Sequence, residues 1–152
     1  MVIWALPIGC VVMSLTGWIL RIHGELYKLT DGRVGHHTIG VPTLLLRTTG
    51  RRSGATRTNA LVYARDGDVY LVVASNGGAD RHPAWLHNVK ANPGVEVQIG
   101  RGRRKGTAKV IERSDPSYER LWEIVNANNH DRYTAYQQNT KRPIPVIAIT
   151  PS

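Results

Sequence analysis

A short, glycine-bracketed stretch of the sequence carries four arginines and no acidic residue. It runs from Leu44 to Asn59 and reads LLLRTTGRRSGATRTN. Glycines on both sides of residues 51–53 let the backbone turn tightly while amides, a hydroxyl and guanidinium groups converge. Arginine recognises phosphate and carboxylate groups through paired hydrogen bonds. The stretch therefore predicts an anion-binding hairpin. Its candidate ligands are Arg51, Arg52, Ser53 and Arg57.

Two further stretches could contribute to the same site. The segment Ser75–Gly78 follows a predicted strand and offers backbone amides, and a predicted helix carries Trp85 and Asn88. An aromatic wall, backbone amides and cationic groups together suit a flat ring attached to an anion. Taken singly, each stretch also has a structural explanation, as a solvated hairpin tip, a plain turn or a core tryptophan. Their combination favours a cofactor pocket.

Several well-known catalytic motifs are absent from the sequence. It contains no P-loop, no Gly-x-Gly-x-x-Gly opening a βαβ unit and no nucleophile elbow. The single cysteine, Cys10, lies in an apolar segment and excludes both an intrachain disulfide and a cysteine-based zinc site. The adjacent pair His36-His37 has no third ligand at a metal-binding spacing, so solvated loop histidines are favoured and no metal is expected. If the protein is an enzyme, a bound cofactor carries the chemistry.

The composition limits the partners. Twenty lysines and arginines against eleven acidic residues give a net charge of +9. Such an excess favours nucleic acid, an acidic membrane surface or a small polyanion. A length of 152 residues suits one domain with a real core. We expect that domain at residues 30–152, after an N-terminal segment at residues 1–29.

The N-terminal segment is apolar. Residues 1–20 carry no charged side chain, and their length is close to that of a membrane span. A signal peptide is disfavoured because no basic residues precede the apolar run and no small-residue cleavage site follows it. Pro7, Gly9 and Gly17 also weaken an uninterrupted spanning helix. Residues 11–29 show an apolar stripe opposite a polar one, which predicts a helix that packs on its domain or lies at a membrane surface, with a true span as the alternative.

The remaining pattern is mainly β. Alternating residues predict six antiparallel strands, at 41–48, 58–65, 68–75, 95–99, 105–112 and 145–149. Asp66-Gly67 is a hairpin signal, and a basic turn is expected at 100–104. Helices are predicted between Pro83 and Asn92 and from Asp115-Pro116 to about Asn126, and residues 130–140 form a polar segment with tyrosines. About six strands with flanking helices indicate a barrel.

Three motifs in one order carry a family resemblance. They are TTGRRSG-x-x-R-x-N at 48–59, ASNGGA at 74–79 and P-x-W-x-x-N-x-x-A-N-P-x-V-x-V at 83–97. From about Leu15 to Pro151, the sequence resembles deazaflavin-dependent nitroreductases, also described as F-420-dependent quinone reductases. The resemblance implies a split β-barrel of the flavin-reductase and pyridoxamine-phosphate-oxidase type. It also implies reduced coenzyme F-420, a deazaflavin that carries a phosphate and an oligoglutamate tail.

The resemblance assigns roles residue by residue. Phosphate and tail contacts match Arg51, Arg52, Ser53 and Arg57. The segments around the deazaflavin ring match Thr58, Asn59, Ala60, Leu61, Val62, Val73, Ala74, Ser75 and Asn76, and the helix that closes over the coenzyme matches Ala84, Trp85, Leu86, His87 and Asn88. The catalytic candidates on the acceptor side are Ser75, Tyr133 and Tyr136, with Tyr133 also a coenzyme contact. Asn76, Ala60 and His130 replace a lysine, a proline and an aromatic residue of the best known relative, so its acceptor preference does not transfer.

The mechanism that the resemblance implies is hydride transfer from the reduced deazaflavin to an acceptor, followed by protonation. The acceptor is expected to be a menaquinone-like quinone or a nitroaromatic compound. Ser75 or Tyr133 is expected to donate a hydrogen bond to the developing negative charge, with Tyr136 acting beside it. In the alternative reading, the two tyrosines only line an apolar mouth. A lipid-soluble quinone would suit a cytoplasmic protein held on the inner face of the membrane by its N-terminus.

Two other functions stay open at this point. A related split barrel could hold flavin mononucleotide (FMN) instead of the deazaflavin. A basic β-barrel could also bind nucleic acid through its arginine hairpins. Phenylalanine is absent and the tyrosines do not alternate with basic residues along the strands, so nucleic acid is not the expected partner.

Overall fold

The computed structural model describes residues 37–38 and 41–152. The strands in this part of the chain are β1 His37–Thr38, β2 Val41–Thr49, β3 Thr56–Val62, β4 Ala64–Asp66, β5 Val69–Val73, β6 Gly94–Ile99, β7 Gly102–Ile111 and β8 Val146–Pro151. The helices are a 3-10 turn η1 at Asn76–Gly78, and α2 Ala84–Ala91, α3 Tyr118–Asn128 and α4 Arg132–Gln138. The predicted N-terminal helix at residues 1–29 and His36 lie outside the described residues.

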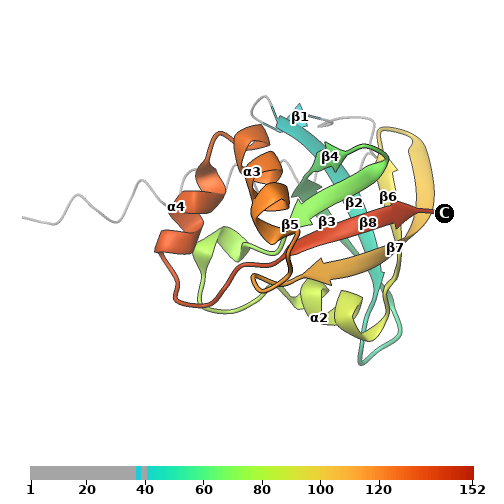
Figure 1. Ribbon diagram of the computed structural model, residues 1–152. Helices are drawn as coiled ribbons and strands as arrows, with labels where there is room; N and C mark the ends of the chain where they lie inside the picture. Colours follow the sequence, from blue (N-terminus) through green and yellow to red (C-terminus); the bar gives the residue numbers. More distant parts are fainter. Residues whose placement is uncertain (1–36, 39–40) are drawn as a thin grey trace, which may run out of the picture.

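The strands form one antiparallel sheet that curves into a barrel (Figure 1). The order is β1-β2-β6-β7-β8-β5-β4, and β3 pairs with β2. Figure 1 shows α3 and α4 together at one side of the barrel and α2 below it. The prediction of a mainly β barrel with flanking helices is confirmed. The described residues contain eight strands rather than about six, because β1 is an additional short strand and one predicted strand divides into β3 and β4.

Tyr63 is the residue at which the predicted strand 58–65 divides. The part before it pairs with β2, where Thr43 lies opposite Val62, and the part after it pairs with β5, where Ala64 lies opposite Leu71. The Tyr63 N–H donates to the carbonyl of Pro42 at 3.1 Å. One run of chain therefore lies along two edges of the sheet and brings the barrel towards closure. Among the described strands, β3 has only β2 as a partner.

Two clusters of buried apolar side chains hold the fold together. The first fills the barrel and includes Val72, and α2 closes it with Trp85. The second lies between the sheet and α3 with α4, and it includes Leu71 and Leu121. Neighbouring residues of β5 thus enter opposite clusters, which explains why this strand is apolar without a break. On the two predicted helices, Trp85, Leu86, Val89, Leu121 and Val125 are buried, whereas Trp122 is half-buried.

Two predicted boundaries are corrected around the basic turn. The turn was expected at residues 100–104, but the ladder between β6 and β7 continues until Ile99 lies opposite Gly102. Only Gly100 and Arg101 lie between the two strands, and Gly100 adopts a φ of 57° that suits glycine. Arg103 and Arg104, which were expected in the turn, are therefore strand residues.

The helical side also differs from the expectation. Residues 130–140, expected as a polar segment, contain the helix α4, which places Tyr133 and Tyr136 on one face. Helix α3 begins at Tyr118 rather than at Pro116, and its N-cap position is Ser117, without a side-chain capping bond, rather than the predicted Asp115. The Asp115 carboxylate instead stabilises the turn before the helix, where it accepts the Ser117 N–H at 2.9 Å and the Ser117 hydroxyl at 2.7 Å. No helix in the described part of the chain is both long and apolar enough to cross a membrane.

Candidate functional site

The β2–β3 hairpin has the tight turn that its glycines predict. The Gly50 N–H donates to the Ala55 carbonyl at 2.7 Å, and the Gly54 N–H donates to the Gly50 carbonyl at 2.9 Å. The Ser53 hydroxyl accepts a hydrogen bond from the Ala55 N–H at 3.2 Å, so this hydroxyl supports the turn itself. A side chain at Gly50 would meet that hydroxyl at 2.7 Å. The turn leaves Arg51 and Arg52 exposed at its tip.

Asn88 ties this hairpin to helix α2. Its side-chain oxygen accepts the Arg51 N–H at 3.0 Å, and its amide nitrogen donates to the Thr48 hydroxyl at 3.2 Å. Asn88 is 8% exposed, and Thr48 is buried. Because both partners belong to the hairpin, the amide fixes the base and the tip of the hairpin against the helix. The sequence suggested Asn88 as a pocket residue, and the structure adds this bridging role.

One cavity of about 1010 Å³ lies between the hairpin, the turn at η1 and helix α2. It is lined by Gly50, Arg51, Arg52, Ser53, Thr56, Arg57, Thr58, Asn59, Asn76, Arg81, His82, Pro83, Ala84, Trp85, His87 and Asn88. The three stretches that the sequence suggested might converge therefore border one space. Four of these residues are arginines, and none of them is an aspartate or glutamate. A cavity with this lining attracts a polyanion and excludes cations.

Some of the predicted contact residues do not line this cavity. Val73, Ala74 and Leu86 are buried, and Leu86 belongs to the cluster inside the barrel. Ala60, Leu61 and Val62 continue β3 beyond the cavity wall, and Leu61 packs against the same cluster. Ser75 is half-buried at the end of β5, directly before the wall residue Asn76.

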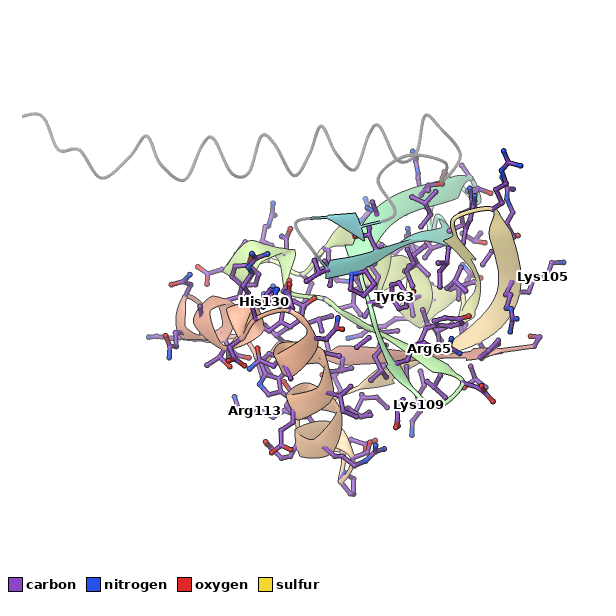
Figure 2. The ribbon with its side chains drawn as sticks, turned by 90° about the horizontal axis from the view of Figure 1, so that it is seen from above. Tyr63, Arg65, Lys105, Lys109, Arg113 and His130 are labelled. Atoms are coloured by element: carbon purple, nitrogen blue, oxygen red, sulfur yellow. The ribbon has the colours of Figure 1, made fainter. Side chains whose placement is uncertain are left out.

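Tyr133 and Tyr136, the two tyrosines that were expected on the acceptor side, pack in the second apolar cluster. Tyr133 is 6% exposed, and its ring centroid lies 6.2 Å from those of Trp122 and Tyr136. Burial raises the pKa of the Tyr133 phenol well above its ordinary value, so this group keeps its proton at neutral pH. Neither tyrosine lines the large cavity. Figure 2 shows His130, which is exposed, at the connection between α3 and α4.

Helix α4 nevertheless approaches the turn at η1. Gly78 has a φ of 82°, and a Cβ atom at this position would lie 2.7 Å from the Tyr136 carbonyl oxygen. Only glycine permits this approach without strain. The tyrosine helix is therefore packed directly against the turn that follows Ser75. The glycine pair in ASNGGA thus has a packing reason as well as a turn-forming one.

Arg142 is a residue that sequence reasoning missed. Its guanidinium donates to the carbonyl oxygens of Ser75 at 2.7 Å, Ala79 at 2.7 Å and Ala74 at 3.3 Å. It also lies 3.1 Å from Nδ1 of His82. Because arginine only donates, this histidine nitrogen must accept, so the ring is neutral. The guanidinium therefore holds both ends of the turn that connects Ser75 to the cavity.

The pKa shifts of His82 and Arg142 agree with this hydrogen-bonding arrangement. Burial, with help from the Arg142 charge, lowers the pKa of His82, and burial also lowers the pKa of Arg142. On the other side of the turn, Asn76 donates to the Arg81 carbonyl at 2.9 Å. No sequence signal identified Arg142, since it lies more than sixty residues from the atoms that it holds. Arg81 and His82 could have been suspected, because they lie shortly after the glycine turn, separated from it by Ala79 and Asp80.

The described residues contain no group of three or more histidine, cysteine, aspartate or glutamate side chains that could hold a metal ion. The cavity itself offers guanidinium groups, two imidazoles, amide groups and one tryptophan. These groups bind, orient and stabilise negative charge, but none is arranged as a nucleophile with its base. The site is therefore suited to hold an anionic cofactor that brings its own reactivity.

Comparisons with known proteins agree with this description. Residues 18–151 match the family model described as F420H(2)-dependent quinone reductase. An F420H(2)-dependent quinone reductase of Mycobacterium tuberculosis is 54% identical over 133 residues, which cover 87% of this chain and 89% of the relative.

Solved structures show the same relationship. An F420-H2 dependent reductase is 38% identical, with a TM-score of 0.63 over 71% of this chain and 93% of its own. A second structure, described as a domain-swapped dimer, is 34% identical, with a TM-score of 0.65 over 88% of this chain and 98% of its own. The predicted split β-barrel is thereby confirmed. With its arginine-lined cavity and these matches, the chain belongs to the F420H(2)-dependent quinone reductase family.

Proposed function

We propose that this protein binds reduced coenzyme F-420 and reduces a quinone with it. The observation that carries the proposal is the cavity in which Arg51, Arg52, Arg57 and Arg81 meet no lining carboxylate. F-420 joins a flat deazaflavin to a phosphate and several glutamates, so it needs cationic groups beside an aromatic wall. The names of the 54% identical relative and of the matching family, both F420H(2)-dependent quinone reductases, support the same coenzyme and acceptor. They favour the deazaflavin over FMN and over nucleic acid.

The residues present fit such a ligand. Arg51, Arg52 and Arg57 would hold the phosphate and the first glutamates, and Trp85 with the backbone of β3 would border the ring. When bound, the reduced deazaflavin supplies a hydride. The protein's part is to bring the acceptor into line and to exclude water from the reacting atoms.

We place the acceptor beside Ser75, on the side of the turn that faces α4. Arg142 donates a hydrogen bond to the Ser75 carbonyl, so the backbone that carries the Ser75 side chain is held in place. The Tyr133 phenol stays protonated because burial raises its pKa, so it keeps an O–H that can donate a hydrogen bond. In this proposal Tyr136, whose ring lies against Tyr133, is the residue nearest to the turn. A nitroaromatic compound would be an alternative acceptor at the same place.

A ligand titration tests the coenzyme assignment. The purified protein is titrated with oxidised F-420, with FMN and with a generic oligonucleotide, and binding is followed by fluorescence or anisotropy. We expect F-420 to bind with a dissociation constant in the low-micromolar range or below, and we expect no such binding of FMN or of the oligonucleotide. Tight binding of FMN or of the oligonucleotide without F-420 binding would replace the proposal with one of the alternatives.

A charge-matched pair of variants tests the hairpin. Removing two charge-assisted contacts in Arg51→Ala/Arg52→Ala should weaken F-420 binding by about 10- to 100-fold, and added salt should shrink that difference. The control variant Arg101→Ala/Arg104→Ala removes the same charge from the β6–β7 hairpin, outside the cavity. It should bind F-420 nearly as well as the unmodified protein. Equal losses in both variants would refute the assignment of the hairpin.

The location in the cell is part of the proposal. A lipid-soluble quinone is reached from a membrane surface, and residues 1–20 carry no charged side chain. We propose a cytoplasmic protein that associates with the inner face of the membrane through this segment. Cells expressing the protein without residues 1–20 should lose the membrane-bound fraction, while F-420 binding by the purified variant stays intact. An unchanged membrane fraction would contradict this assignment.

A further inference from the structure

The lining of the large cavity changes in chemistry between the hairpin and the segment that follows β5. On the hairpin side, Arg51, Arg52 and Arg57 present guanidinium groups, which only donate hydrogen bonds. Asn76 and His82, which come after β5 in the chain, also line the cavity. Each of these two side chains already makes one hydrogen bond within the protein. That bond determines which polar atom is left for a ligand.

The partner of Asn76 fixes the orientation of its amide group. The side-chain nitrogen donates to the Arg81 carbonyl at 2.9 Å. A carbonyl oxygen cannot donate, so the nitrogen rather than the oxygen of the amide must face it. Asn76 is exposed and has a φ of 46°, a left-handed conformation that asparagine tolerates better than most residues do. Its side-chain oxygen is therefore offered to the cavity as a hydrogen-bond acceptor.

The partner of His82 fixes the tautomer of its ring. Nδ1 accepts a hydrogen bond from the Arg142 guanidinium at 3.1 Å, so the hydrogen of the neutral ring is on Nε2. The guanidinium is itself held by the carbonyl oxygens of Ser75 and Ala79, each at 2.7 Å. Burial, followed by the positive charge of Arg142, lowers the pKa of His82, so the ring is neutral at pH 7. His82 therefore offers the cavity an uncharged N–H donor.

An uncharged donor and an acceptor in one segment select a particular kind of ligand group. Phosphate and carboxylate groups only accept hydrogen bonds, so the Asn76 oxygen repels them. A ring edge on which a carbonyl group stands next to an N–H satisfies both residues, because its oxygen accepts from His82 and its N–H donates to Asn76. Trp85, in the same lining, can border the face of such a ring. This part of the cavity is therefore suited to a planar imide rather than to an anion.

We propose that Asn76 and His82 bind the carbonyl and N–H edge of the pyrimidinedione ring of the deazaflavin. This inference rests on the proposed function, because it specifies how the same cavity orients the coenzyme. The two residues act on the ring, whereas the hairpin arginines act on the phosphate and the tail. Flavins carry the same ring edge, so this pair determines which end of the coenzyme meets the segment after β5 and does not by itself separate F-420 from FMN.

An F-420 analogue methylated at the imide nitrogen tests the contact with Asn76. Methylation removes the N–H, and fluorescence of the oxidised coenzyme measures both dissociation constants without catalytic turnover. For the unmodified protein, we expect the methylated analogue to bind about 5- to 20-fold more weakly than F-420, as suits the loss of one hydrogen bond. In Asn76→Ala the two dissociation constants should agree within about twofold, because the partner of the N–H is already gone.

Asn59→Ala is the matched control. Asn59 also lines the cavity, but it belongs to β3, so this variant loses the same amide group from a different element. Whatever its overall affinity, the ratio between the two ligands should stay that of the unmodified protein. A ratio of one in the unmodified protein, an unchanged ratio in Asn76→Ala or an equal fall in both variants would overturn the inference. Failure of F-420 itself to bind would instead overturn the proposed function.

Nitrogen-15 NMR of the histidine rings tests the donor role of His82. In the free protein at pH 7, we expect the His82 signals of the neutral tautomer that carries its hydrogen on Nε2. Saturation with F-420 should move the Nε2–H proton resonance to lower field, as a new hydrogen bond does. A His82 ring with its hydrogen on Nδ1, or an Nε2–H resonance that F-420 leaves in place, would refute the assignment of His82.

Discussion

Replacing Asn88 by alanine should weaken coenzyme binding through the backbone of the arginine hairpin. The Asn88 side chain accepts the Arg51 N–H at 3.0 Å and donates to Thr48 at 3.2 Å. Asn88→Ala removes both bonds and leaves the hairpin tip attached to helix α2 only by packing. Arg51 then samples more positions, and the coenzyme must order it on binding. The expected result is a higher dissociation constant with the arginines still present.

The size of this effect follows from the two hydrogen bonds. A neutral hydrogen bond contributes about 1 kcal/mol net, and a buried polar group left without a partner costs about 1 to 3 kcal/mol. Thr48 is buried, whereas Arg51 is exposed and water can replace its lost bond. We therefore expect the free energy of unfolding to fall by about 2 to 3 kcal/mol. The loss of the Arg51 bond alone should raise the dissociation constant about fivefold.

Thr48→Val separates the two hydrogen bonds. This variant removes the bond from Asn88 to the Thr48 hydroxyl but keeps the one from the Arg51 N–H. It should lose stability, because the Asn88 amide is left with an unsatisfied donor, and it should bind F-420 normally. Denaturant unfolding measures the stabilities, and fluorescence titration measures the affinities. If Thr48→Val weakens F-420 binding as much as Asn88→Ala does, the link through the Arg51 backbone is refuted.

Three further changes probe the turn beside the cavity. Arg142→Ala should lower the free energy of unfolding by about 2 to 3 kcal/mol and should lower kcat. Arg142→Lys should restore both quantities in part. Equal activity in Arg142→Ala, Arg142→Lys and the unmodified protein would contradict the role of the guanidinium. Gly78→Ala should cost about 2 to 4 kcal/mol in denaturant unfolding because its Cβ meets the Tyr136 carbonyl at positive φ, whereas Gly77→Ala, with open space, should cost only about 1 to 2 kcal/mol. Because burial lowers the pKa of His82, its contribution to stability is full above the ordinary histidine pKa of 6.5 and is lost as the pH falls below that value. The free energy of unfolding, measured at several pH values, should therefore depend less on pH in His82→Gln than in the unmodified protein.

Local sequence patterns predicted the elements well where each strand kept one environment. The hairpin at residues 50–55 and the helix after Pro83 appear where turn chemistry and apolar spacing place them. The division at Tyr63 could not be predicted, because side chains alternate through it while the pairing partner changes from β2 to β5. The helix α4 was missed because its polar residues mask the spacing of Tyr133 and Tyr136, which share an apolar cluster with residues of α3. Both failures come from partners distant in sequence.

The candidate site divides in the same way. Arg51, Arg52 and Arg57 could be recognised because cations and glycines occur together within one short turn. Arg142 could not be recognised, because its partners are carbonyl groups, and a carbonyl group leaves no trace in the residue type that carries it. Arg103 was assigned to a turn, but it lies on β7, with its guanidinium 3.9 Å from the Glu96 carboxylate. Charge concentrated along the chain is therefore predictable, and charge assembled across strands requires the structure.

The single pairing partner of β3 affects how this cavity can change during evolution. A strand inside a sheet is held by two ladders, so a substitution that shifts its backbone disturbs both neighbours. In the described sheet, β3 is bonded to β2 alone, yet it contributes Arg57, Thr58 and Asn59 to the cavity wall. Residues on this strand can be exchanged with less disturbance to the rest of the barrel. Ligand preference in this fold can therefore diverge faster along β3 than along β6 or β8, which are paired on both sides.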